Sequence, residues 1–492
     1  YGTQGKNKLE YCHPFINRHI VPARNLALAG NFNIINAEEL YAHIGQEPNE
    51  EVRSSDLAAL LELIYKFLNE ADEKAPDQLD IKSVLQKTIP LLDGGFNVGG
   101  ITGNGIAFVF RDPHGIRPSY YYINDEVVVA ASERAAIRTS FNVPENQVQE
   151  LMPGQGLIVY EDGRAVVEQL VAPKERKACS FERIYFSRGS DEKIYRERNQ
   201  LGFRLSEPVL EAIQYDLRNT IFSFIPNTAE TAFYGMLKGM EQYLNRIKVE
   251  RILSWGKDFD EEKLREMINR TIRIEKIAIK DVKMRTFITE DVSRNEMVQH
   301  VYDITYGTVR PGEDTLVVID DSIVRGTTLK ESIIRMLGRL RPKKIIVVSS
   351  CPQIRYPDCY GIDMSKMGDF IAFNAAVSLL KEAGRADFLQ DLLERCRTLE
   401  KEGKLQEENV VRQLYKQFTT EQITGKIATL ITPPELNIPV EVIFQRIEDL
   451  HASCPNNLGD WYFTGNYPTP GGNRVVNKAF MNYMEGKNVR GY

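Results

Sequence analysis

Several signals of specialised proteins are missing from this 492-residue sequence. The six cysteines are scattered and form no C-x-x-C pair, which disfavours a disulfide framework and favours reduced thiols in a cytoplasmic protein. No apolar run approaches the roughly 18 residues that would suggest a membrane span. The formal net charge of -6 disfavours a general nucleic-acid binder. There is also no internal repeat and no Walker A loop.

The composition is that of an ordinary globular protein. Hydrophobic residues make up 42% of the chain and charged residues 26%, and the length is sufficient for two or three domains. The sequence opens on Tyr1, with neither an initiator methionine nor a signal peptide. We therefore expect the native protein to begin upstream of Tyr1.

The pattern of predicted elements changes along the chain. Over residues 1–165, an acidic helix capped by Ser55 or Asp56 accompanies a meander of strands between Pro/Gly turns, which predicts an antiparallel sheet. Over residues 166–400, short apolar strands alternate with amphipathic helices, which predicts a mainly parallel, doubly wound sheet. Residues 401–492 predict C-terminal helices and an irregular tail. The expected fold class is therefore α+β followed by α/β.

The stretch "TLVVIDDSIVRGTTLKES", residues 315–332, points most directly to a ligand. An apolar strand ends in Asp320 and Asp321, at the edge of the sheet where doubly wound folds bind ligands. Two adjacent carboxylates there can accept hydrogen bonds from vicinal hydroxyls or face a hydrated Mg²⁺. Thr328 and Glu331 have capping-box spacing, so a helix should begin near Thr328 and direct backbone N–H groups at an anion. Gly326 permits close approach of the backbone.

This string resembles the motif of type I phosphoribosyltransferases that binds 5-phosphoribosyl pyrophosphate (PRPP). The resemblance implies that the two acids bind the ribose hydroxyls and contact Mg²⁺, and that the loop wraps the 5′-phosphate. It assigns PRPP binding to Asp320, Asp321, Ser322, Ile323, Val324, Arg325, Gly326, Thr327 and Thr328. An acidic turn before a capped helix would be the alternative for a bare Asp-Asp-Ser, but the full string is much more specific.

Other segments, taken in order, resemble the glutamine phosphoribosylpyrophosphate amidotransferase family. They are "RDPHGIRP" (111–118), "AASERAAI" (130–137), "FERIYFSRGSD" (181–191), "PQIRYPDCYGIDM" (352–364) and "FTGNYPT" (463–469). The resemblance implies a glutaminase domain of the Ntn-hydrolase type (an αββα sandwich) followed by a type I phosphoribosyltransferase domain. It also implies the first committed step of purine biosynthesis: PRPP, glutamine and water give 5-phosphoribosylamine, pyrophosphate and glutamate. Homo-oligomers and feedback by purine nucleotides are further implications.

The correspondence has gaps in both halves. Arg285 matches a family arginine on the loop that closes over PRPP, whereas Ala229 stands where better-known members have a Mg²⁺-contacting serine. The resemblance assigns glutamine binding to Thr3, Gly30 and Asp56, with Asp56 receiving the α-amino group. Ala29 stands where the family has the asparagine of an oxyanion pair.

The family's N-terminal cysteine nucleophile has no counterpart in this sequence. We therefore expect the chain as given to use ammonia only. Because no cysteine adjoins the "FTG" segment, no iron–sulfur cluster is expected. Two alternatives stay open: a non-enzymatic sensor that binds PRPP or purine nucleotides, and a phosphoribosyltransferase whose nucleophile is a base. A glutaminase-like half argues against the second, because a base acceptor needs no ammonia.

Overall fold

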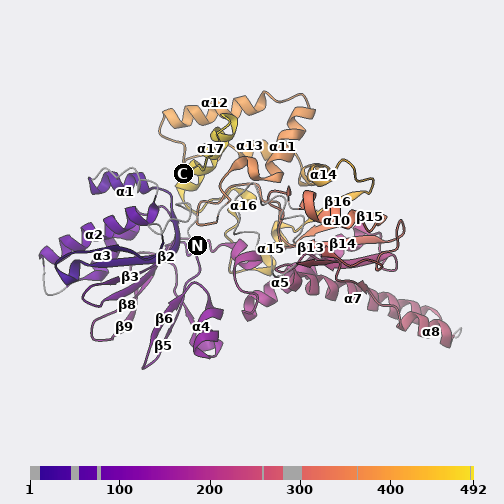
Figure 1. The fold of residues 1–492 in the computed structure, drawn as a ribbon, viewed down its shortest axis with the longest axis horizontal. Coiled ribbons are helices and arrows are strands. Elements are labelled where there is room, and N and C mark those ends of the chain that lie inside the picture. The colour runs from indigo at the N-terminus through magenta and orange to yellow at the C-terminus, as the bar shows by residue number, and fades with distance from the viewer. Residues whose placement is uncertain are drawn as a thin grey trace.

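The computed structural model describes residues 12–45, 55–74, 79–256, 260–280, 302–327, 329–362, 364–487 and 489–491. Figure 1 shows two bodies joined side by side, with an antiparallel sheet in the N-terminal one and a parallel sheet in the other. A long helical arm, formed by α7 (Glu230–Ser254) and α8 (Glu261–Ile268), extends from the second body. Among the described residues, no helix is both long enough and apolar enough to cross a membrane.

The N-terminal body is built on a six-stranded antiparallel sheet. Its strands, in spatial order, are β1 (Phe15–Asn17), β2 (Leu26–Ile34), β3 (Gly94–Thr102), β4 (Ala107–Arg111), β8 (Gln155–Val159) and β9 (Ala165–Gln169). The helices α1 (Ala37–Ile44), α2 (Asp56–Lys74) and α3 (Ile81–Thr88) share one apolar core with it. A second sheet contains β6 (Val128–Ala131), β5 (Tyr120–Ile123) and β7 (Gln149–Glu150), beside α4 (Arg134–Phe141). The alternation of the β2 residues fits a sheet with one face on the core.

The "RDPHGIRP" segment is a turn held together by a buried carboxylate. The Asp112 carboxylate accepts hydrogen bonds from the N–H groups of His114 at 3.0 Å and of Ile116 at 3.0 and 2.9 Å. Gly115 allows this tight reversal because its φ is +61°, where other residues are strained. The turn sends the next side chain, Arg117, back toward β2.

The second body is built on five parallel strands. Their order is β11 (Arg273–Ile274), β10 (Thr220–Phe224), β14 (Thr315–Asp320), β15 (Lys344–Ser349) and β16 (Val440–Phe444). Both faces are covered: α7 packs on one, and α11 (Ile371–Glu382) and α14 (Thr420–Ile431) lie on the other. Because β14 is buried on both sides, it reads as a continuous apolar run.

The sheet continues beyond the region where the sequence predicted strands. The strand β16 pairs in parallel with β15, although the sequence predicted only helices and an irregular tail after residue 400. The "PTPGGN" stretch likewise begins a regular helix, α17 (Pro470–Met484), with Pro470 at its first turn. The five residues of β16 are too few for their apolar pattern to distinguish a strand from a helix or loop without the neighbouring strand β15.

The two bodies are joined by polar contacts between buried groups. The Asn33 side chain on β2 donates a hydrogen bond to the Cys359 carbonyl at 2.8 Å. The Gly471 N–H at the start of α17 donates to the Asp93 carboxylate at 3.0 Å. Arg134 forms an ion pair with Asp191, the N-cap of α5 (Glu192–Arg204), with N–O distances of 2.8 and 2.5 Å. These contacts fix the N-terminal body against the elements around the parallel sheet.

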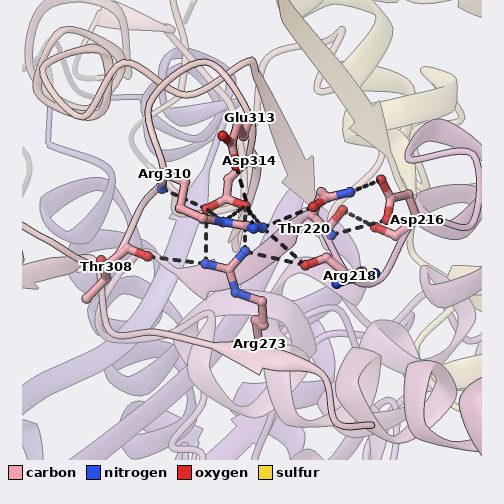
Figure 2. Close-up of polar contacts among 9 residues, drawn as sticks. Asp216, Arg218, Thr220, Arg273, Thr308, Arg310, Glu313 and Asp314 are labelled. Atoms are coloured by element: carbon pink, nitrogen blue, oxygen red, sulfur yellow. Dashed lines mark hydrogen bonds and ion pairs between the residues drawn. The ribbon is translucent and has the colours of Figure 1, made fainter. Parts of the chain in front are cut away.

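A buried acid anchors the opposite end of the parallel sheet from the acid pair. Figure 2 shows Asp314, just before β14, between Arg273 and Arg310, which both donate hydrogen bonds to it. Arg310 also donates to the Asn219 side chain at 3.0 Å, beside the start of β10. Although burial opposes it, hydrogen bonding from the two arginines lowers the pKa of Asp314 to about 2.

We expect the Asp314→Asn variant to lower the free energy of unfolding at pH 7 by about 3 kcal/mol, because it leaves two arginines without their buried anion. The stabilisation by Asp314 is complete above its unfolded pKa, near 4, and is lost as the pH falls through about 2. Urea denaturation measures this change. Glu313→Gln is the matched control, since Glu313 is 66% exposed and pairs with Arg310 only at 3.6 Å; an equal loss there would contradict the assignment.

Candidate functional site

The acid pair stands at the carboxyl edge of the parallel sheet, as the sequence predicted. Asp320 ends β14, and its carboxylate accepts a hydrogen bond from the Asp321 N–H at 2.8 Å. The Ser322 hydroxyl donates to Asp321 at 2.9 Å. Burial and the charge of Asp321 raise the pKa of Asp320 well above its ordinary value, and burial raises the pKa of Asp321 to about 6. Two carboxylates held this close favour a ligand that brings hydroxyl donors or positive charge.

Three further residues surround the acid pair, and of these only Tyr185 lies in a segment quoted in the sequence analysis. Arg198 on α5 is only 5% exposed, and its positive charge lowers the pKa of Asp321. Thr228, in the turn after β10, lies close enough to Asp321 for its hydroxyl to lower the pKa of that acid. Tyr185 lies close enough for both acids to raise its pKa, after the larger effect of burial. They come from segments that are up to 136 residues away in the chain, so only the fold brings them together.

The turn after the acids presents free backbone donors. In the described part of the chain, the N–H groups of residues 323–326 donate no hydrogen bond to another residue. The turn is nevertheless fixed, because the Ile371 N–H donates to the Val324 carbonyl at 2.8 Å and Arg325 pairs with Asp369 at 3.0 Å. Gly326 has a φ of +73°. A fixed turn of unsatisfied N–H groups beside a helix start is a site for a phosphate.

The predicted residues of this turn do not all point the same way. Ile323 is 4% exposed and packs in the core, so its side chain supports the turn and only its backbone is available. Ser322 and Gly326 are half-buried, and Arg325 and Thr327 are exposed. The helical segment that follows begins as a π-type turn over Leu329–Ile334, next to the predicted start. Thr328 lies outside the described residues, as does Arg285.

A magnesium ion would find a partial set of ligands at this edge. No group of three or more His, Cys, Asp or Glu that could hold a metal occurs in the described ranges. The paired carboxylates of Asp320 and Asp321 nevertheless fit Mg²⁺, which commonly takes one or two protein carboxylates and completes its shell with water and substrate phosphates.

The N-terminal body places a second acid at the end of β2. Asp56, the first residue of α2, accepts hydrogen bonds from the N–H groups of Ile34 at 3.0 Å and Leu57 at 2.9 Å. The Ser55 hydroxyl accepts from the Ala58 N–H at 3.3 Å, so the serine caps the helix and leaves the acid available. Burial raises the pKa of Asp56 to about 6, against the lowering effect of these hydrogen bonds and of the Arg490 charge.

The predicted partner of Asp56 is less well placed. The Gly30 N–H donates to His13 Nδ1 at 3.3 Å. Gly30 lies four positions before Ile34 on the strand, a distance of about 13 Å. Asn31 lies one position closer than Gly30 to Ile34 along β2. It also carries a side-chain amide, which Ala29 lacks. It shares β2 with both residues and was missed because an asparagine in a strand has no distinctive spacing. Thr3 lies outside the described residues.

We expect Asp56→Asn to weaken glutamine binding at pH 7 by about tenfold to a hundredfold, because an amide cannot pair with an α-ammonium group. For the wild type, glutamine affinity should fall as the pH drops below about 6, where Asp56 gains a proton. Isothermal titration with glutamine in the full-length protein measures both effects. Asp80→Asn is a control, since Asp80 caps α3 through the Ser83 N–H and lies outside the proposed site. An unchanged affinity in Asp56→Asn would contradict the assignment.

Known proteins resemble the chain in both halves. Residues 14–139 match a glutamine amidotransferase domain family. The amidophosphoribosyltransferase of Pseudomonas aeruginosa is 29% identical over 409 residues, which cover 80% of this chain and 73% of the relative. That of Escherichia coli is 28% identical over 407 residues (80% and 72%), and that of Saccharomyces cerevisiae is 25% identical over 422 residues (81% and 74%).

Solved structures share the fold. The glutamine PRPP amidotransferase from B. subtilis, complexed with ADP and GMP, superposes with a TM-score of 0.62 at 23% identity and covers 94% of this chain and 81% of its own. The domain match and the antiparallel sheet define the first half as a glutamine amidotransferase domain. The parallel sheet, with its turn of free N–H groups after β14, has the fold of a phosphoribosyltransferase-type domain. The fold class predicted from the sequence is confirmed. The chain is similar in sequence to amidophosphoribosyltransferases over about 80% of its length.

Proposed function

We propose that this protein is a pentosyltransferase of purine biosynthesis, which forms 5-phosphoribosylamine from PRPP with nitrogen from glutamine. The observation that supports this most is the pairing of Asp320 and Asp321 with the free N–H groups of the turn that follows them. A sugar that bears vicinal hydroxyls and a 5′-phosphate matches both parts at once. The likeness to amidophosphoribosyltransferases extends over about 80% of the chain.

The residues at the sheet edge suit displacement of pyrophosphate by ammonia. Asp320 and Asp321 accept hydrogen bonds from the ribose hydroxyls, and residues 322–328 hold the 5′-phosphate. As the bond from the anomeric carbon to pyrophosphate breaks, positive charge grows on the ribose and the nearby carboxylates stabilise it. Asp320 and Asp321 would hold Mg²⁺, which would supply positive charge to neutralise the leaving pyrophosphate. Arg285 is the proposed cationic partner of that pyrophosphate.

The N-terminal body is proposed to release the ammonia. Asp56 binds the α-ammonium group of glutamine, and Thr3 and Gly30 complete its contacts. The Asn31 side chain supplies the donor to the developing oxyanion that Ala29 cannot supply. Hydrolysis of glutamine by water gives glutamate and ammonia, and the ammonia passes to the second body. Because this step needs a nucleophile that the sequence does not contain, the chain as given should use ammonia only.

Regulation and assembly form part of the same proposal. The B. subtilis structure was solved with ADP and GMP, which supports purine nucleotides as inhibitors here. A homo-oligomer in the cytoplasm is the expected state of the protein.

Pyrophosphate release tests this function directly. The protein is incubated with PRPP and Mg²⁺, with ammonium or glutamine as the nitrogen donor, and pyrophosphate and 5-phosphoribosylamine are quantified. Both products should form with ammonium. Calorimetric binding of PRPP or a purine nucleotide, with no pyrophosphate released, would instead support a sensor.

A further inference from the structure

Arg117 occupies a buried position between the two bodies. It follows the Asp112 turn and is only 5% exposed. Its Nη2 atom donates a hydrogen bond to Asn31 Oδ1 at 2.9 Å and pairs with Glu182 Oε1 at 3.1 Å. Its Nε and Nη1 atoms are buried without a hydrogen-bond partner among the described residues. One nitrogen of Arg117 therefore makes both contacts. A displacement of Glu182 would shift this nitrogen and change its hydrogen bond to Asn31.

The first contact sets the orientation of the Asn31 amide. A side-chain amide has an acceptor oxygen and a donor NH₂ group on opposite sides. Because Arg117 holds the oxygen, the NH₂ group is directed away from Arg117. In the described part of the chain, this NH₂ group donates to no other residue. It is therefore available as a donor to a bound ligand at β2.

The second contact reaches the acid pair through a short turn. Glu182 opens the turn Glu182–Phe186, and its carboxylate accepts from the Ser187 hydroxyl at 3.3 Å. Arg198 holds the other side of the turn by donating to the Tyr185 carbonyl at 3.0 Å and the Ser187 carbonyl at 2.7 Å. The charge of Arg198 also acts on Asp321. The turn is thus fixed between Arg117 and the proposed PRPP site.

We propose that Arg117 is a positioning residue for the use of glutamine: it holds the Asn31 amide oxygen so that the NH₂ group faces glutamine, and Glu182, on the turn beside the proposed PRPP site, holds Arg117 in place. This inference rests on the proposed function and assigns to it a residue that touches neither substrate. It requires that Arg117 influence glutamine use without contributing to the reaction of PRPP with ammonia.

The test compares glutamine and ammonium as nitrogen donors in Arg117 variants of the native protein, because the chain as given is expected to use ammonia only. Arg117→Met should lower the ratio of glutamine-dependent to ammonia-dependent pyrophosphate release by at least about tenfold, in the range usual for coupled sites. The loss should appear in kcat for glutamine more than in its KM. Arg117→Lys, which retains a charge that one nitrogen can share between Asn31 and Glu182, should restore part of the ratio.

Arg134→Met is the matched control, because Arg134 also makes a buried ion pair between the bodies but contacts neither Asn31 nor Glu182. It should leave the ratio unchanged even if both variants melt at a lower temperature. Equal ratios in wild type and Arg117→Met, equal losses in both methionine variants, or a wild type without glutamine-dependent turnover would overturn the inference. A wild type that releases no pyrophosphate with ammonium would instead refute the proposed function.

Discussion

The Asp321→Asn variant is expected to lose on the order of 10³-fold in kcat/KM for PRPP, because two hydrogen bonds between a carboxylate and ribose hydroxyls contribute roughly 2 kcal/mol each. Ammonia-dependent pyrophosphate release measures this loss and does not depend on the glutamine side. Asp391→Asn, an exposed acid on α12 (Phe388–Lys401), is the control and should react at the wild-type rate. A loss below about tenfold would contradict direct binding of the ribose by this acid.

The same variant should be more stable than the wild type at pH 7. Burial raises the pKa of Asp321 to about 6 from 3.8, so the folded protein is favoured while the acid is protonated. That advantage is complete below the unfolded pKa of 3.8 and is lost as the pH rises through about 6. The neutral amide should therefore gain up to about 3 kcal/mol at pH 7 and nothing near pH 4. If Asp321→Asn lowers the activity and raises the stability, the acid is present for binding PRPP and not for stabilising the fold.

The part of this site that the sequence revealed is the part encoded in consecutive residues. The apolar β14, its two acids and the Gly326 turn form one continuous string, so their spacing alone places a ligand at the sheet edge. The fold class followed from the same kind of evidence, because a buried parallel strand and an amphipathic helix each carry their own pattern.

Residues that meet only after folding left no such pattern. Arg198 is one charged residue among several on α5, and nothing in its spacing shows that it is buried beside Asp321. The strand β16 was missed because its apolar stretch is short and its partner β15 lies almost a hundred residues earlier. In the N-terminal body, Asn31 is marked out only by Arg117, which donates a hydrogen bond to its side-chain amide oxygen. Long-range packing decides each of these cases.

Gly326→Val should raise the KM for PRPP by about a hundredfold with little further change in kcat. The φ of +73° is costly for any residue with a Cβ, most of all for a β-branched one, by about 1–3 kcal/mol. A Cβ there would also stand 3.1 Å from Ile431 and 3.2 Å from Ile371, which both pack on the turn. The turn should therefore shift, and its N–H groups would no longer converge on the 5′-phosphate.

Gly384→Val separates this effect from the backbone strain alone. Gly384 has a similar φ, +67°, but its Cβ position has no atom within 4 Å, and it lies after α11, away from the turn. Both variants should melt at lower temperatures than the wild type, whereas only Gly326→Val should lose affinity for PRPP. If the two glycine variants gave the same KM for PRPP, the turn would not be the phosphate site. If Gly326→Val alone lost PRPP binding, the site would require glycine because the backbone at Gly326 closely approaches the ligand.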